Sequence, residues 1–230
     1  MKDINRATLK LEAKKRLRGN WGWAVGLTAV MLLIAWLFAV PVSIKTISVR
    51  PDVLTFSSNI GLEVIGSLFA SFFALSLSIT FLRFMRGHKD NFVDSLFAVF
   101  TKGRFVPELL AYLLQYLYIF LWTLLLVIPG IIKEYSYAMT PYIVNDLVES
   151  GQEVHYNEAI TASRNLMRGH KWQLFVLRLS FFGWLFLSAF TLGIGYLWVV
   201  PYMETTEANF YRALAGDSYL KAKTASPKIS

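Results

Sequence analysis

Long apolar runs, separated by short polar and basic segments, dominate the hydrophobic pattern of this chain. A helix needs about 20 apolar residues to cross the roughly 30 Å hydrocarbon core of a bilayer. The pattern therefore predicts an all-α membrane protein with six transmembrane helices, at residues 21–44, 60–82, 105–128, 131–147, 172–192 and 197–214. The fourth run is shorter and more polar, so we expect a tilted or kinked helix, and the sequence leaves open whether it fully spans the bilayer. The segment between the first two runs, residues 45–59, is expected to be a polar loop.

A short basic or amphipathic segment precedes the first, third and fifth runs, at residues 3–21, 91–105 and 157–172. Each segment ends at a glycine, a residue that tolerates the left-handed backbone after a helix, and an aromatic residue follows. The glycine–aromatic pairs are Gly19 and Trp21, Gly103 and Phe105, and Gly169 and Trp172. We expect the three aromatic side chains to be interfacial anchors. We also expect the three segments to be surface helices that rest on the cytoplasmic leaflet, with Ala13, Ser95 and Ser163 at shallow depth.

This order of elements occurs three times along the chain. Each unit contains a surface helix, a glycine, an aromatic residue, a membrane helix and a return helix. We place the units at about residues 1–83, 90–147 and 155–214, within a single polytopic membrane domain that covers residues 1–215. Residues 216–230 are polar and are predicted to form a disordered cytoplasmic tail.

The distribution of positive charge predicts the orientation. The chain carries 23 Lys and Arg residues and a net charge of +8. If the N-terminus is cytoplasmic, 19 of the 23 lie in cytoplasmic segments, and three lie outside, namely Lys45, Arg50 and Lys133. Positive residues collect on the cytoplasmic side, so both termini are expected to be cytoplasmic. A signal peptide is rejected because the basic start and the first apolar run are both too long for one.

The composition supports the membrane class and excludes several kinds of site. The sequence is 55% hydrophobic and only 17% charged, with a mean hydropathy of +0.47. It has no cysteine, which excludes disulfides and cysteine-based metal sites or nucleophiles. The histidines, His88, His155 and His170, are isolated from carboxylate clusters, so we expect solvated side chains, no bound metal and no cofactor. The basic surplus favours anionic lipid headgroups over nucleic acid as the partner.

Charged residues at membrane depth are the candidate functional groups, because such charges are costly unless they are paired or functional. Arg178 lies roughly 9 Å inside the cytoplasmic end of the fifth run, and Glu207 lies at a similar depth in the sixth. We predict that these two residues form an ion pair, with Glu204, one turn deeper, as the alternative partner. Asp146 is a further acidic candidate for the same polar cluster. Two interpretations stay open: an ion pair that locks the hairpin, or a polar site for an ion, a proton or a headgroup.

Residues that interrupt helices lie near these charges. They are Pro129, Gly130, Pro141 and Pro201. Broken helices line substrate sites in some transporters, but proline kinks also occur where neighbouring helices stabilise them. The sequence does not decide between these two roles.

Several motifs in the second half of the chain resemble a known family. The segments are IPGIIKEYSYAMTPYIVND, ASRNLMRGHKW, LRLSFFGW and GIGYLWVVPYMETTEANFY. They are similar to a bacterial multi-pass membrane protein family found mostly in Firmicutes, the domain-of-unknown-function family number 975. The resemblance implies a Gram-positive plasma-membrane protein of uncharacterised role and supplies no catalytic residues. The Pro-Gly and R-G-x-x-W elements also resemble the membrane domains attached to some glycerophosphodiester phosphodiesterases, over the later part of the chain.

Three functional hypotheses follow. The first is a non-enzymatic membrane scaffold or regulator of a partner, since the sequence contains no legible catalytic motif. The alternative is a small transporter or channel for an ion, small solute or lipid that uses the cluster around Arg178, Glu204 and Glu207. The third, an intramembrane enzyme that acts on lipid, is least favoured because no nucleophile–base pair is evident. A membrane-protein partner and a homo-oligomer both stay open.

Overall fold

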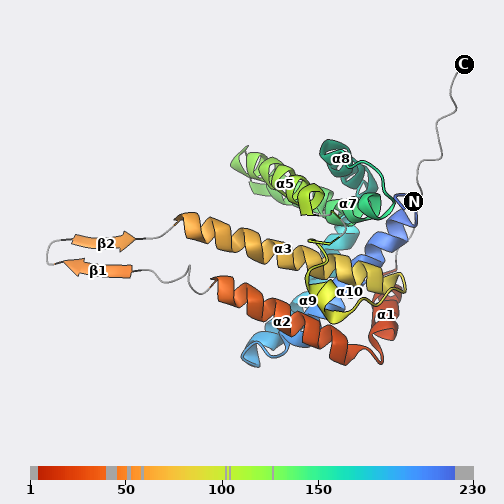
Figure 1. The fold of residues 1–230 in the computed structure, drawn as a ribbon, viewed down its shortest axis with the longest axis horizontal. Helices are drawn as coiled ribbons and strands as arrows, with labels where there is room; N and C mark the ends of the chain where they lie inside the picture. The colour runs from red at the N-terminus through yellow and green to blue at the C-terminus, as the bar shows by residue number, and fades with distance from the viewer. Residues whose placement is uncertain are drawn as a thin grey trace, which may run out of the picture.

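Helices make up almost all of the computed structural model, which describes residues 5–39, 46–50, 53–57, 60–101, 103, 105–125 and 127–220 (Figure 1). The helices are α1 (Arg6–Leu17), α2 (Trp21–Ala39), α3 (Ile60–Met85), α4 (Phe92–Leu96), α5 (Phe105–Leu125), α6 (Val127–Tyr137), α7 (Thr140–Glu149), α8 (Tyr156–Leu166), α9 (Lys171–Phe190) and α10 (Tyr196–Ala215). Two short strands, β1 (Thr46–Arg50) and β2 (Val53–Ser57), complete the elements. The fold is therefore helical with one small hairpin. The expected tail after residue 220 lies outside the described residues.

The apolar runs become helices close to their predicted positions. Two described helical segments are long and apolar enough to cross a membrane, Phe105–Leu124 and Lys171–Phe190. A third span is added if Arg6–Leu17 and Trp21–Ile34, which meet at a bend of 97°, are counted as one. The described part of the chain thus contains two or three such helices, and the six crossings expected from the sequence stay a prediction.

The segment after the first apolar run differs from the expected polar loop. β1 and β2 pair antiparallel, with Thr46 opposite Ser57 and Arg50 opposite Val53. Their sequences, TISVR and VLTFS, are rich in β-branched residues, which favour strands. The hairpin projects from the ends of α2 and α3, at the opposite end of the molecule from α1 (Figure 1).

The predicted helix breaks fall differently along the chain. Pro129 and Gly130 lie in the first turn of α6, directly after the end of α5 at Leu125, so the third run does end beside them. Pro141 lies in the first turn of α7, where a proline is tolerated. The fourth run is divided between α6 and α7, and α6, with 11 residues, covers only roughly 16 Å. Pro201 does not break α10, which continues through it to Ala215. Packing of α10 against α3 and α9 stabilises the helix there.

The three surface helices, α1, α4 and α8, each pack on the return helix of another unit. α4 contacts α3 and α8 contacts α7, so the second and third surface helices each lie on the return helix of the preceding unit. The first surface helix, α1, contacts α10, the return helix of the last unit. The return helices also meet one another, because α3 contacts both α7 and α10. The rings of Tyr142 on α7 and Tyr211 on α10 stack 5.2 Å apart. The polar residues of the return helices are thereby gathered at the centre of the protein.

The surface helices are more deeply packed than the sequence suggested. The side chains of Ala13, Ser95 and Ser163 are fully buried in the protein and so face the helix bundle, while the depth of their helices in a membrane stays a prediction. The Ser163 hydroxyl donates to the carbonyl of Ser136 and accepts from the N–H of Met139. The second of these helices, α4, has only five residues. Small side chains at these positions allow the helices to approach the bundle closely, which an amphipathic pattern alone does not specify.

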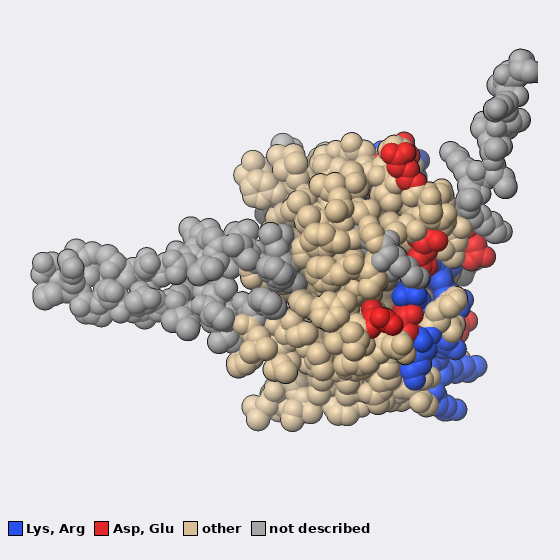
Figure 2. Space-filling view, viewed as in Figure 1, with Lys and Arg blue, Asp and Glu red and all other residues tan. Residues whose placement is uncertain are grey.

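Large apolar side chains cover much of the outer surface. Trp36, Phe120, Trp184 and Phe190 are each more than half exposed, and Leu192 is 95% exposed. Figure 2 shows an almost uncharged surface between the hairpin and the opposite end, where Lys and Arg gather near α1. A soluble monomer rarely exposes apolar surface on this scale.

Candidate functional site

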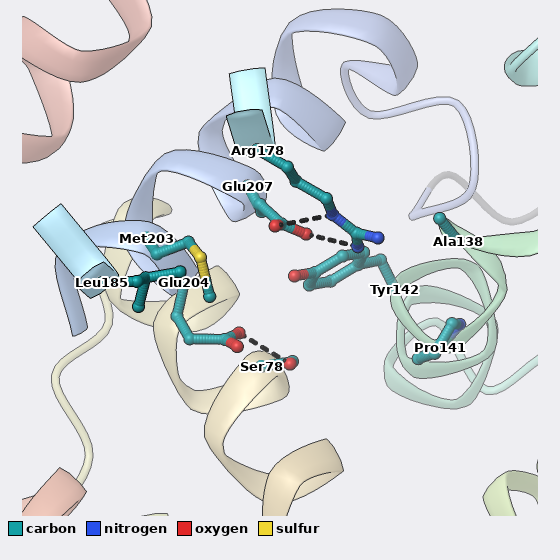
Figure 3. Close-up of a pocket in the computed structure, with 9 residues that line it drawn as sticks. All are labelled: Ser78, Ala138, Pro141, Tyr142, Arg178, Leu185, Met203, Glu204 and Glu207. Atoms are coloured by element: carbon teal, nitrogen blue, oxygen red, sulfur yellow. Dashed lines mark hydrogen bonds and ion pairs between the residues drawn. The ribbon is translucent and has the colours of Figure 1, made fainter. Parts of the chain in front are cut away.

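A pocket of about 380 Å³ lies where α3, α7, α9 and α10 converge (Figure 3). Its polar groups come from four different helices. They are Ser78 of α3, Tyr142 of α7, Arg178 of α9, and Glu204 and Glu207 of α10. Ala138, Pro141, Leu185 and Met203 complete the lining. The pocket thus contains one guanidinium and two carboxylates inside a largely apolar bundle.

The tight connection between α9 and α10 brings these charges together. A Cβ atom at Gly195 would lie 2.6 Å from the Ser188 hydroxyl oxygen and 2.9 Å from the Ser188 Cα, so only glycine fits this close approach. The Gly195 N–H donates to the hydroxyl of Thr191, which closes the turn. The two helices are therefore adjacent and antiparallel. Glu204 and Glu207 are three residues apart and share one face of α10.

Arg178 and Glu207 form a two-point ion pair. The guanidinium Nε and Nη2 atoms donate to the two carboxylate oxygens, both at 2.9 Å. The ring of Tyr135 lies under the guanidinium, with its centroid 5.4 Å from Cζ, and a Glu134 oxygen lies 3.9 Å from Nη1. The side chains of Arg178 and Glu207 are 32% and 11% exposed. The pairing predicted from their matching depth is confirmed.

Glu204 is held differently from Glu207. The Ser78 hydroxyl donates to one Glu204 carboxylate oxygen at 2.7 Å (Figure 3). Among the described residues, Ser78 is its hydrogen-bond partner, and no lysine or arginine lies within ion-pair distance of it. One carboxylate of the pocket is therefore neutralised by the protein, while the other has only a hydroxyl donor.

Asp146 belongs to a separate buried network, not to the predicted cluster. It forms an ion pair with Arg86, whose Nη2 donates to Oδ2 at 2.6 Å, and the Tyr211 hydroxyl donates to the same oxygen at 2.7 Å. The Asp146 side chain is fully buried. Burial alone would lower the pKa of the Arg86 guanidinium, but the hydrogen bonds and charge of Asp146 outweigh it and raise that pKa. Sequence reasoning counted Arg86 only among the basic residues of the cytoplasmic segments and so missed this pair.

The expected interfacial anchors are not equivalent. Trp172 is 71% exposed and stacks on Phe175. Trp21 is partly buried against the α2–α3 core, and Phe105 stacks on Phe100 with their centroids 5.2 Å apart. Only Trp172 therefore has the outward position expected of an anchor.

The histidines also differ from one another. His88 and His155 are exposed, whereas His170 is buried, with its Nδ1 atom 2.9 Å from a Gln173 side-chain oxygen. Within the ranges that the structure describes, no three His, Asp or Glu side chains come together in a group that could hold a metal ion.

Comparison with known proteins identifies the family. The model of a family described as Protein of unknown function (DUF975) matches residues 1–132 and 123–218, which together cover nearly the whole chain. No curated protein and no solved structure is significantly similar. The match agrees with the resemblance carried by the motifs of the second half of the sequence. The chain belongs to the DUF975 family.

Proposed function

We propose that this protein is an integral membrane protein with six crossings and both termini in the cytoplasm of a Gram-positive bacterium. Two or three helices long and apolar enough to cross a membrane support the proposal, as does the exposed apolar surface. The start of α1 and the end of α10 lie at the same end of the molecule, away from the hairpin (Figure 1). An even number of crossings is consistent with this arrangement.

Within that membrane protein, we propose that the central pocket binds a small, positively charged organic solute, as part of a transporter or channel. The observation that carries the proposal is the Glu204 carboxylate in the wall of the pocket, with Ser78 as its donor and no cationic partner among the described residues. A carboxylate at membrane depth is costly unless a positive charge compensates it. An ammonium group in the pocket would supply that charge.

The rest of the lining fits the same class of ligand. A volume of about 380 Å³ suits a small organic molecule rather than a bare metal ion. The phenol of Tyr142 offers a polar edge and an aromatic face, and aromatic faces attract organic cations. Arg178, which would repel a cation, is already neutralised by Glu207. The proposed role is non-enzymatic.

Uptake by proteoliposomes tests this function. The purified full-length protein would be reconstituted and supplied with radiolabelled methylammonium, choline or putrescine. Glu204→Gln removes the charge while it keeps an oxygen that can accept from Ser78, and Asp94→Asn is the matched control at an exposed carboxylate of α4. We expect the wild type and Asp94→Asn to take up or bind at least one amine, and Glu204→Gln to lose this activity.

A scaffold or regulator would give a different result in this assay. If no amine is transported or bound by the wild type, or if Glu204→Gln behaves like Asp94→Asn, the solute-binding proposal fails. Co-purification of a stable partner from native membrane would then favour the scaffold or regulator.

A further inference from the structure

A second pocket, distinct from the central one, lies at the corner between α8 and α9. Its volume is about 460 Å³, and its lining contains Arg164, Arg168, Gly169, Lys171 and Trp172. Three of these five residues are cations and none is acidic. We call this set the α8–α9 corner.

The fold fixes these cations on the outside of the corner. Gly169 has a φ of +82°, a left-handed conformation that turns the chain directly from α8 into α9. Arg164 lies in the last turn of α8 and Arg168 in the turn that directly follows it, and both side chains are exposed. Ser163 and Met167, which directly precede the two arginines and lie on the inner side, are fully buried. Packing of the inner face therefore holds the two guanidinium groups at the outer rim.

The positive charge of the corner is not compensated by the protein. Among the described residues, no carboxylate lies within ion-pair distance of Arg164, Arg168 or Lys171, and Arg168 donates only to the Asn165 side chain, at 3.3 Å. Three cations thus share the lining of one pocket.

The start of α9 adds to this field. The first turn of a helix has N–H groups without an intrahelical acceptor, and it carries a partial positive charge. His170, which precedes α9, makes no side-chain hydrogen bond that caps these N–H groups. An anion at the corner would therefore meet guanidinium donors together with the positive end of a 20-residue helix.

We propose that the α8–α9 corner binds a phosphate group, presented by an anionic phospholipid of the cytoplasmic leaflet. Guanidinium groups match phosphate oxygens with paired hydrogen bonds. α9 is one of the helices long and apolar enough to cross a membrane, and the corner lies at its first residue, where headgroups would surround the protein. The exposed indole of Trp172 is typical of that same level.

The corresponding corner between α1 and α2 offers a matched comparison. Lys14, Arg18 and Gly19 occupy the same positions relative to the turn, and Gly19 has a φ of +80°. There, however, the Lys89 ammonium donates to Asn20, which follows the glycine, and Trp21 is partly buried. There the Lys89 side chain is bonded to the turn, so Lys14 and Arg18 provide a control pair with the same charge and the same positions relative to the glycine.

Thermal unfolding of the full-length protein in dodecylmaltoside micelles tests the proposal. Dioleoylphosphatidylglycerol, dioleoylphosphatidylcholine or inorganic phosphate would be added to the wild type, to Arg164→Gln/Arg168→Gln, and to Lys14→Gln/Arg18→Gln. Both pairs are exposed, so both variants should unfold like the wild type without additive. We expect phosphatidylglycerol to raise the unfolding temperature of the wild type and the control pair. The corner variant should need roughly tenfold more lipid for the same shift, since hydrogen bonds to charged groups are lost.

Each outcome distinguishes a source or overturns the idea. A shift with phosphatidylglycerol but not with inorganic phosphate identifies a lipid headgroup as the ligand. A shift with inorganic phosphate alone, lost in the corner variant, retains phosphate binding but assigns it to a soluble source. If no additive stabilises the wild type, or if both double variants respond equally, the corner is not a phosphate site. These results do not depend on the central pocket, because neither arginine lines it.

Discussion

Replacing Asp146 with alanine would leave two buried groups without their partner, the guanidinium of Arg86 and the hydroxyl of Tyr211. The carboxylate accepts two hydrogen bonds from Arg86 and one from Tyr211, and its side chain is fully buried. The Arg86 side chain is only 10% exposed, so water does not replace the lost contacts well. Asp146→Ala should therefore be among the most destabilising single substitutions in the protein.

The size of the effect follows from this burial. Removing one partner of a buried ion pair typically costs about 3–5 kcal/mol, because the remaining charge is uncompensated. We expect about 4 kcal/mol for Asp146→Ala, a large part of the total stability of about 5–15 kcal/mol that proteins usually have. Tyr211→Phe removes a single hydrogen bond to a charged group and should cost about 1.5–3 kcal/mol. Asp146→Asn, which keeps the shape but loses the charge, should fall between the two.

Unfolding by SDS in mixed micelles, followed by tryptophan fluorescence, measures these free energies. The double variant Arg86→Leu/Asp146→Leu removes both charges and should be more stable than Asp146→Leu alone, because an unpaired buried charge is the costly state. The double-mutant cycle gives the coupling free energy directly. Additive effects, or a cost below about 1 kcal/mol for Asp146→Ala, would refute the argument that this network is a desolvated lock between α3, α7 and α10.

Three further predictions concern other parts of the fold. Arg178→Leu should lower the free energy of unfolding by about 2–3 kcal/mol, less than Asp146→Ala, because the Arg178 side chain is 32% exposed. Adding Glu207→Leu should recover part of this loss, and equal losses for Arg178→Leu and Asp146→Ala in the same SDS titration would contradict the argument from burial. Since the chain has no cysteine, Ser48→Cys in β1 should react with a membrane-impermeant maleimide only from outside the cell, and labelling only from inside would contradict six crossings with cytoplasmic termini. Gly130→Ala should destabilise the protein by about 1–3 kcal/mol, because its Cβ would lie 2.3 Å from the Thr123 hydroxyl oxygen and 2.9 Å from the Thr123 Cα. Gly183→Ala is the control and should be nearly neutral, since nothing lies within 4 Å of its Cβ. Equal effects of the two substitutions on unfolding would rule out the close approach of α5 and α6.

The ion pair of the central pocket could be predicted from the sequence because its cause is local. Arg178 and Glu207 lie on either side of a short connection, so counting residues from the turn gives their relative depth. The confirmed pairing shows that such an argument works where two helices must be neighbours. Asp146 had no such constraint. Its partner Arg86 is 60 residues away in sequence, and only the packing of α3 against α7 brings them together.

The packing of the surface helices, in contrast, could not be predicted from the sequence. Their amphipathic pattern gave the helices and the glycine turns, but one face of a helix can be buried either in lipid or in protein. Ala13, Ser95 and Ser163 are buried in protein because small side chains suit close packing against α10, α3 and α7. The two strands within residues 45–59 were not predicted either, because their β-branched residues are interspersed with polar and turn residues.

The sequence by itself determined the helical class, the approximate ends of the long helices, the glycine corners and the pairing of Arg178 with Glu207, because all of these depend on local periodicity or on short connections. Only the tertiary structure decided which surface helix lies on which return helix, that Glu204 has Ser78 as its donor, and that Asp146 is locked to Arg86. These contacts join residues far apart in the chain, and their energies depend on burial, which hydrophobic periodicity does not assign to particular partners.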